Sequence, residues 1–169
     1  MHTNFARCWQ QLQLNPFRSS LRDPALIRRL SQTIAQAEAG HRGEIRLVIE
    51  ARLPLKQAWQ GQTARQRAVQ WFTDLHVWDT ECNTGMVLYL LLAERKIELV
   101  ADRGIAARVP QTQWDEICQR LQSDLALTQI EVGLATAITT LGQLLQQHFP
   151  LETAQINPNE LDNTPVIVP

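Results

Sequence analysis

The sequence has few cysteines and no long apolar run, and each absence argues against a class of protein. Its three cysteines, Cys8, Cys82 and Cys118, are an odd number without the spacing of a disulfide framework. No segment reaches the roughly 18 apolar residues of a membrane-spanning helix, and the first residues carry no apolar signal region. We therefore expect a cytoplasmic protein with three free thiols and no transmembrane segment.

Net charge is also nearly absent, since the formal charge is −1 at pH 7. That balance gives no reason to expect a nucleic acid or an acidic lipid surface as a partner. The charge is uneven, with eight arginines against four acids in residues 1–52 and three acids without a base in residues 151–169. We interpret both regions as solvated surface rather than as binding patches.

Motifs of well-known enzyme classes are missing as well. The chain has no glycine-rich phosphate loop, G-x-S-x-G, H-E-x-x-H or C-x-x-C. His76, Asp79, Glu81 and Cys82 do fall within seven residues. They could form a cysteine–histidine nucleophile or hold a metal. Their spacing matches no known ligand pattern, so an ordinary polar loop is the preferred interpretation.

What the chain does contain is organised around residues 80–107. An apolar run over residues 86–93 predicts a strand covered on both faces. A charged break follows at residues 94–96, and residues 97–101 then predict an antiparallel partner strand. The connection is not an Asn-Gly turn, so we expect a looser one. The two open ends of this hairpin, at residues 80–85 and 102–104, should lie side by side, and we expect any functional site there.

The other elements are predicted in chain order. Asp23 and Pro24 mark the start, and Gly40 the end, of a helix over residues 24–39. A strand covers residues 44–50. Residues 55–75 look helical, with a bend or a division at Gly61. Two more helices are predicted over residues 111–124 and 128–148, before an irregular, acidic, proline-containing tail over residues 151–169.

This order predicts one α/β domain. Strands 44–50 and 86–93 flank a helical segment, so we expect them to be parallel in a small mixed sheet of about four strands sandwiched between α-helices. We divide the chain into an N-terminal extension (1–20), the domain (21–150) and the tail (151–169). Trp59, Trp71 and Trp114 fall in helical patterns and are expected in the core, whereas Trp78 falls in the loop before the hairpin.

Several short pieces resemble the TPM domain, known from thylakoid-lumen photosystem repair proteins and from many bacterial proteins. The resemblance covers residues 24–150 and is closest to the short bacterial branch of the family. The matching pieces, in order, are Gly43-Glu44-Ile45, Gly85-Met86-Val87-Leu88-Tyr89-Leu90, Asp102-Arg103-Gly104-Ile105, Trp114, Gly133-Leu134, Gly142 and His148-Phe149-Pro150. The resemblance implies the same α/β/α sandwich.

The resemblance also implies a range of functions. Some members look like acid phosphatases, some bind divalent cations such as calcium, and some are accessory factors of membrane complexes. Members with the acidic pattern carry one acid at the start of the central strand and one in the helix after the second strand. Asn83 and Gln111 stand at those positions here. Neutral amides weaken both the calcium and the phosphatase interpretation, since hard cations need carboxylates.

We therefore predict a non-catalytic binding or accessory module with an unidentified protein partner, and with no cofactor, catalytic residue or metal ligand assigned. The alternative is a phosphatase that depends on calcium or another divalent cation, with an altered site at Asp79, Glu81, Asp102 and Arg103. The candidate site at the open end of the hairpin comprises Asp79, Glu81, Asn83, Thr84, Gly85, Asp102, Arg103, Gly104 and Gln111.

Overall fold

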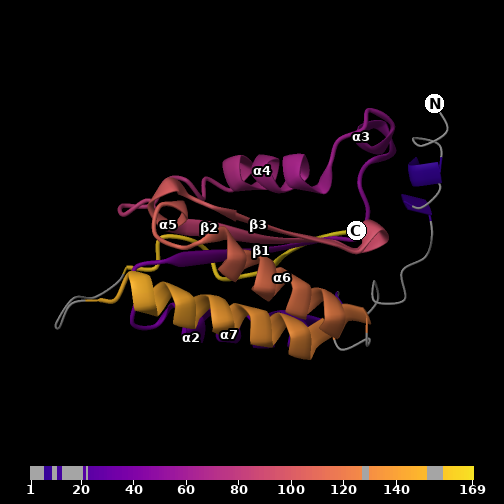
Figure 1. The fold of residues 1–169 in the computed structure, drawn as a ribbon. Coiled ribbons are helices and arrows are strands. Elements are labelled where there is room, and N and C mark those ends of the chain that lie inside the picture. Colours follow the sequence, from indigo (N-terminus) through magenta and orange to yellow (C-terminus); the bar gives the residue numbers. More distant parts are fainter. Residues whose placement is uncertain (1–5, 9–10, 13–20, 22, 127–129, 152–157) are drawn as a thin grey trace.

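The structure, a computed structural model, describes residues 6–8, 11–12, 21, 23–126, 130–151 and 158–169. Figure 1 shows a sheet between two layers of helices. The elements, in order, are α2 (Pro24–Glu38), β1 (Glu44–Glu50), α3 (Leu55–Trp59), α4 (Ala64–Asp74), β2 (Gly85–Leu91), the 3₁₀ turn η3 (Leu92–Glu94), β3 (Lys96–Ala101), α5 (Arg103–Ala106), α6 (Gln111–Ala126), α7 (Ile130–His148) and β4 (Val166–Val168).

The four strands form one mixed sheet in the order β3-β2-β1-β4. β1 and β2 are parallel, with Glu44 opposite Gly85, and β2 and β3 are antiparallel, with Met86 opposite Ala101. The predicted sheet and its strand directions are therefore confirmed. Both central strands are buried along their whole length, as their apolar runs indicate.

The prediction of an irregular tail is wrong at its end. β4 lies parallel to β1 and fills the edge of the sheet opposite to β3, with Val48 opposite Val166. Its three residues Val166, Ile167 and Val168 are aliphatic, but the run is too short to stand out in a segment rich in proline and acids. Pairing with β1, not local pattern, makes this segment a strand.

The predicted start of the helix over residues 24–39 and the predicted division at Gly61 are also confirmed. Asp23 Oδ1 accepts from the Ala25 N–H at 2.9 Å and caps α2, and Pro24 is the first helical residue. Gly61, at φ +79°, separates α3 from α4. Thr63 caps α4 in a capping box with Gln66. The hairpin connection is the looser one expected, a 3₁₀ turn that ends with Arg95 in the left-handed region.

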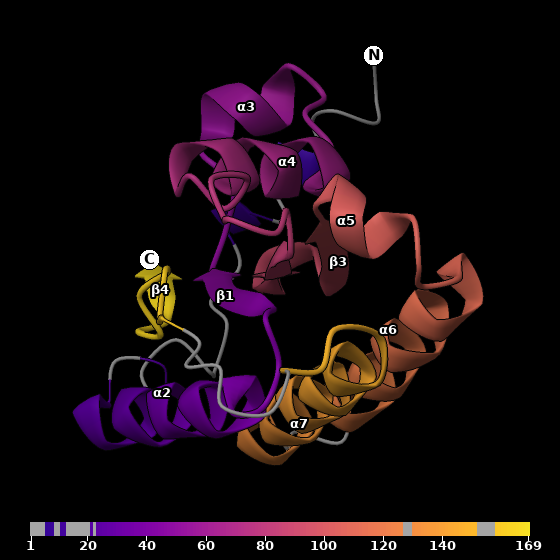
Figure 2. The same cartoon turned by 90° about the vertical axis from the view of Figure 1, so that its left-hand side faces the viewer.

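Figure 2 shows α3 and α4 on one face of the sheet and α2, α6 and α7 on the other. The strands feed a core on each face, because β1 directs Ile45, Leu47 and Ile49 to one and Val48 to the other. Trp114 is buried as predicted, whereas Trp59 is 58% exposed and that prediction is wrong. α3 is only five residues long and leaves Trp59 at its exposed end.

Most of the predicted N-terminal extension, and the residues 128–129 predicted to start the last helix, lie outside the described residues. Where the N-terminal segment is described, it is held at the hairpin connection. Arg7 Nε lies 2.7 Å from Glu94 Oε1, and Gln11 Nε2 donates to the same carboxylate at 2.7 Å. None of the helices in the described residues is long and apolar enough to cross a membrane.

Candidate functional site

The loop over residues 75–84 packs tightly against the start of β2. A Cβ on Gly85 would lie 2.0 Å from the Val77 carbonyl oxygen, so only glycine fits there without moving the backbone. Thr84 is buried, and its hydroxyl donates to the Arg42 carbonyl at 2.5 Å. The Glu44 N–H donates to the Thr84 carbonyl at 3.1 Å. The loop is thereby fixed to the start of both parallel strands.

Residues 80–85 and 102–104 are neighbours in space, as the hairpin predicts. The Gly104 N–H donates to the Asn83 carbonyl at 3.1 Å, and Arg103 Nε donates to Asn83 Oδ1 at 3.1 Å. Asn83 has a positive φ of 53°, which asparagine tolerates better than most residues. A Cβ on Gly104 would lie 2.5 Å from the Asn83 carbonyl oxygen, so the missing side chain permits this contact.

Asp102 has a local structural role at this end of the sheet. Its backbone N–H donates to the Gly85 carbonyl at 2.9 Å, and its Oδ1 accepts from the Arg103 N–H at 2.6 Å and caps α5. Its Oδ2 is buried and has no hydrogen-bond partner among the described residues. One carboxylate oxygen is therefore committed to the backbone.

The other predicted acids are not gathered around Asp102. Asp79 is exposed, and its N–H closes a turn on the His76 carbonyl at 2.9 Å. Glu81 is exposed, and its N–H donates to Glu160 Oε2 at 2.9 Å. The Cys82 sulfur accepts from Arg42 Nη1 at 3.8 Å. Within the described residues, no group of three or more His, Cys, Asp or Glu side chains is arranged to hold a metal ion.

Gln111 lies on the first turn of α6, and its Nε2 donates to Asp115 Oδ1 at 2.9 Å. It lines a groove of about 210 Å³ beside the open edge of β3, together with Arg65, Leu99, Trp114 and Cys118 among others. Its amide is thus engaged along its own helix. Burial raises the pKa of the Cys118 thiol to about 11, so this cysteine is a poor nucleophile.

A second polar group, missed from the sequence, lies under α4 at the far end of β1. Glu50 is fully buried, and its two carboxylate oxygens accept from Arg67 Nη2 at 2.8 Å and from Arg67 Nε at 2.9 Å. The Tyr89 hydroxyl and Trp71 Nε1 donate to the same carboxylate at 2.8 and 3.3 Å. The pKa of Tyr89 is raised by burial and by the adjacent Glu50 charge. Every partner is another buried or half-buried side chain, so this is a structural network.

A third polar group lies between α2, β1 and the C-terminal segment. Glu38 is buried, and its Oε1 accepts from the Ile45 N–H at 2.7 Å. Burial and the nearby Glu44 raise the pKa of Glu38 to about 8. Arg46 is also buried, burial lowers its pKa, and its Nη1 has no hydrogen-bond partner among the described residues. Arg46 and Glu50 are charged residues within the mostly apolar strand β1. That pattern in the sequence could have pointed to both the second and the third polar group.

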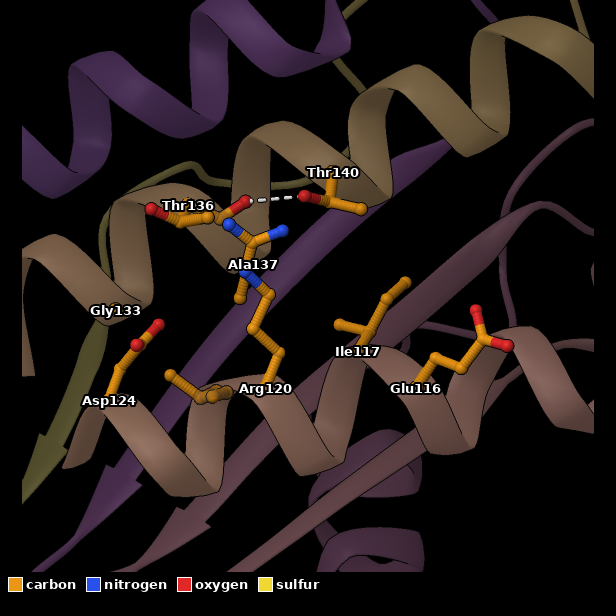
Figure 3. Close-up of a pocket in the computed structure, with 9 residues that line it drawn as sticks. Glu116, Ile117, Arg120, Asp124, Gly133, Thr136, Ala137 and Thr140 are labelled. Carbon is orange, nitrogen blue, oxygen red and sulfur yellow. Dashed lines mark hydrogen bonds between the residues drawn. The ribbon is translucent and has the colours of Figure 1, made fainter. Parts of the chain in front are cut away.

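Figure 3 shows a small groove of about 140 Å³ between α6 and α7. Arg120 and Asp124 reach into it from α6, opposite Gly133, Thr136 and Thr140 of α7. The Thr140 hydroxyl is already bound to the Thr136 carbonyl at 2.8 Å. A Cβ on Gly133 would lie 2.8 Å from Asp124 Cβ. The groove is therefore a close helix crossing with charged rims, and it holds no arrangement suited to catalysis.

Comparisons with known proteins agree with this architecture. The family model of the TPM domain matches residues 22–144. Among solved structures, the chain is similar to the BA42 protein of the psychrophilic bacterium Bizionia argentinensis, determined by NMR. The TM-score is 0.74 at 23% identity, over 85% of this chain and 92% of that one. No match was found among curated proteins.

Proposed function

The chain belongs to the TPM domain family, and on that premise we propose that it is a non-catalytic binding module that holds a protein partner. The observation that carries the proposal is the hydrogen bond from Arg103 Nε to Asn83 Oδ1 at 3.1 Å. A guanidinium occupies the oxygen where the resemblance places an acid. A divalent cation at that position would meet a positive charge and a neutral amide.

The arrangement of the remaining acids supports the same proposal. A hard cation is bound by several convergent oxygens, and phosphoryl transfer needs a cation or a set of cationic groups at the transferring phosphoryl. Asp102 Oδ1 already accepts the Arg103 N–H at the start of α5, and the Gln111 side chain is hydrogen-bonded to Asp115. Among the candidate residues Arg103 is the sole cation, and Asp79 and Glu81 are exposed acids that would repel a phosphate.

The same loop has features of a protein-binding surface. Trp78 is 49% exposed, and its ring centroid lies 6.1 Å from that of His76. Exposed tryptophans are enriched among the residues that dominate protein–protein binding energy. Because Gly85 and Thr84 fix the loop, it would meet a partner with little loss of conformational entropy.

We also propose that the protein works in the cytoplasm and has no nucleic-acid partner. The three cysteines are free in the structure, which suits a reducing compartment. The formal charge of −1 offers no general attraction to phosphate backbones.

The catalytic alternative is tested with the matched variant Asp102→Asn, which retains an oxygen acceptor for the α5 cap but loses the charge. Hydrolysis of p-nitrophenyl phosphate is measured with calcium, magnesium or manganese, and calcium binding by calorimetry. We expect no calcium heat for the wild type and equal background turnover for both proteins. Wild-type turnover a hundredfold above the variant would establish an enzyme and overturn the proposal.

The proposed binding of a protein partner is tested by cross-linking the tagged full-length chain in an extract of its own cells. We expect a specific cross-linked partner that Trp78→Ala loses. Val132→Ala is the matched control, because Val132 is another exposed apolar residue, on α7. Equal retention of the partner by Trp78→Ala and wild type would show that this loop is not the binding surface.

A further inference from the structure

The outer edge of β1 is covered by a segment that lies beyond the region matched by the family model. That match ends at residue 144, whereas residues 160–168, here called the C-terminal strap, run alongside β1 (Figure 2). The strap ends in β4, and the Ala51 N–H donates to the Val168 carbonyl at 2.8 Å. A strand that would otherwise be an open edge is thereby paired over part of its length.

The apolar contacts of the strap come from two adjacent residues. Val166 packs into the core beneath α3 and α4, and Ile167 packs into the core on the opposite face of the sheet. Consecutive residues of a strand point to opposite faces. The β1 edge therefore selects an extended chain with two adjacent aliphatic residues, one for each core.

The polar contacts of the strap select an acid. Asp162 attracts the buried guanidinium of Arg46 through space, while its own Oδ1 accepts from the Thr164 N–H at 2.8 Å. The Leu161 N–H donates to Glu44 Oε2 at 3.3 Å, and Glu160 Oε2 accepts from the Glu81 N–H at 2.9 Å. Glu160, six positions before Val166, is therefore the acid that joins the strap to the neighbouring loop by a hydrogen bond.

The strap pairs with only part of the β1 edge and leaves a buried donor of β1 without an acceptor among the described residues. β4 pairs with only three residues, Val48, Ile49 and Glu50, although β1 begins at Glu44. Arg46 is 6% exposed, yet its Nη1 lacks a hydrogen-bond partner among the described residues. A buried donor without an acceptor destabilises the arrangement that leaves it unpaired. A strand that paired further along β1 and gave Arg46 an acceptor would bind better than the strap does.

We propose that the outer edge of β1 is a strand-addition site for an extended peptide of a protein partner, parallel to β1, with an acidic residue six positions before two adjacent aliphatic residues. The strap occupies this site in cis and competes with the partner. The inference rests on the proposed function, because it assigns the partner a surface and a chemistry. Strand addition uses main-chain hydrogen bonds for affinity and alternate side chains for specificity.

The test uses the full-length chain and a fluorescein-labelled peptide with the sequence of residues 158–169. Ile167→Asp places a charge in a core contact and should release the strap. Val132→Asp makes a similar change at an exposed position of α7. By fluorescence anisotropy, Ile167→Asp should bind the peptide at least tenfold more tightly than wild type or Val132→Asp. A peptide with Glu160→Ala, which cannot accept from the Glu81 N–H, should bind that variant about tenfold more weakly.

Failure of the wild-type peptide to bind a folded Ile167→Asp protein, as judged by circular dichroism, would overturn the proposal. Hydrogen exchange of the wild type provides a test without a variant. The Ala51 amide should exchange through local opening, at least tenfold faster than the slowest amides of β2. Exchange of Ala51 only through global unfolding would show that the strap does not detach, and would also overturn the proposal.

Two further outcomes separate this inference from its premise. Phosphatase turnover by the wild type would overturn the proposed function. The anisotropy measurement of peptide binding does not depend on turnover, so it tests the strand-addition site separately. A wild-type dimer in light scattering that does not bind the peptide would assign the edge to the strap of a second copy, and would overturn the assignment to a different partner.

Discussion

Two buried carboxyl groups, Glu38 and Glu50, differ in the groups that surround them. Glu50 receives both arms of Arg67 and two further side-chain donors. Glu38 accepts the Ile45 N–H and lies near the carboxylate of Glu44. Burial disfavours the charged form of a carboxyl group unless partners compensate for the lost hydration. The pKa of Glu38 is accordingly raised, from 4.5 to about 8.

The raised pKa of Glu38 predicts a loss of stability with rising pH. Between pH 4.5 and about 8, folded Glu38 keeps a proton that the unfolded chain releases, so the free energy of unfolding falls across this window and levels off above it. Glu38→Gln keeps an acceptor for the Ile45 N–H but cannot ionise. In urea unfolding from pH 5 to 9, the free energy of unfolding of Glu38→Gln should rise by about 1–3 kcal/mol relative to that of the wild type. A constant difference would contradict this prediction.

The Glu50 network predicts a strong asymmetry between single and paired substitutions. Arg67→Met leaves a buried carboxylate without its cation and should lower the free energy of unfolding by about 3–5 kcal/mol. Glu50→Gln combined with Arg67→Met removes both charges and should recover about half or more of that loss. Urea unfolding at pH 7 measures both variants. Equal destabilisation of the single and the paired variant would show that the charge of Glu50 is compensated by other groups.

At the scale of elements, the sequence predicted what local pattern determines. The apolar run at residues 86–93, the cap at Asp23 and the break at Gly61 each correspond to an observed feature. β4 depends on pairing with β1, a segment far away in the chain, which periodicity does not encode. The bond between Arg103 and Asn83 was likewise not foreseen, although their loops were predicted to be neighbours.

β2 pairs with a neighbouring strand on each side along nearly its whole length, whereas β1 pairs with β4 over three residues only, so β2 should tolerate substitution least. Leu88 lies in its middle and is fully buried. Leu88→Ala should cost about 2–5 kcal/mol, from lost burial and the cavity left behind. Val69→Ala, at an exposed position of α4, is the control and should change stability by less than about 0.5 kcal/mol. A denaturation midpoint equal to wild type for Leu88→Ala would contradict the burial of this strand.

At the scale of the whole molecule, one sheet separates two cores and is shared by both. One core lies beneath α2, α6 and α7 and includes Trp114, and the other lies beneath α3 and α4 with Trp71 packed against it. Neither core can form without β1 and β2, because the same strands supply side chains to each. The two helical layers are therefore linked through the sheet, although they lie on opposite faces of it (Figure 2).

This shared sheet predicts a single cooperative unfolding transition. Trp114→Phe removes the tryptophan of one core, and Trp71→Phe removes the tryptophan packed against the other, while Trp9, Trp59 and Trp78 remain in both variants. If neither core persists alone, urea midpoints from fluorescence in both variants should coincide with the midpoint from far-ultraviolet circular dichroism of the same protein. The strap pairs only with the outer edge of β1, so its detachment should precede this transition in hydrogen exchange without changing either tryptophan signal. Fluorescence midpoints that differ from the circular dichroism midpoint in one variant only would mean that the two layers unfold independently.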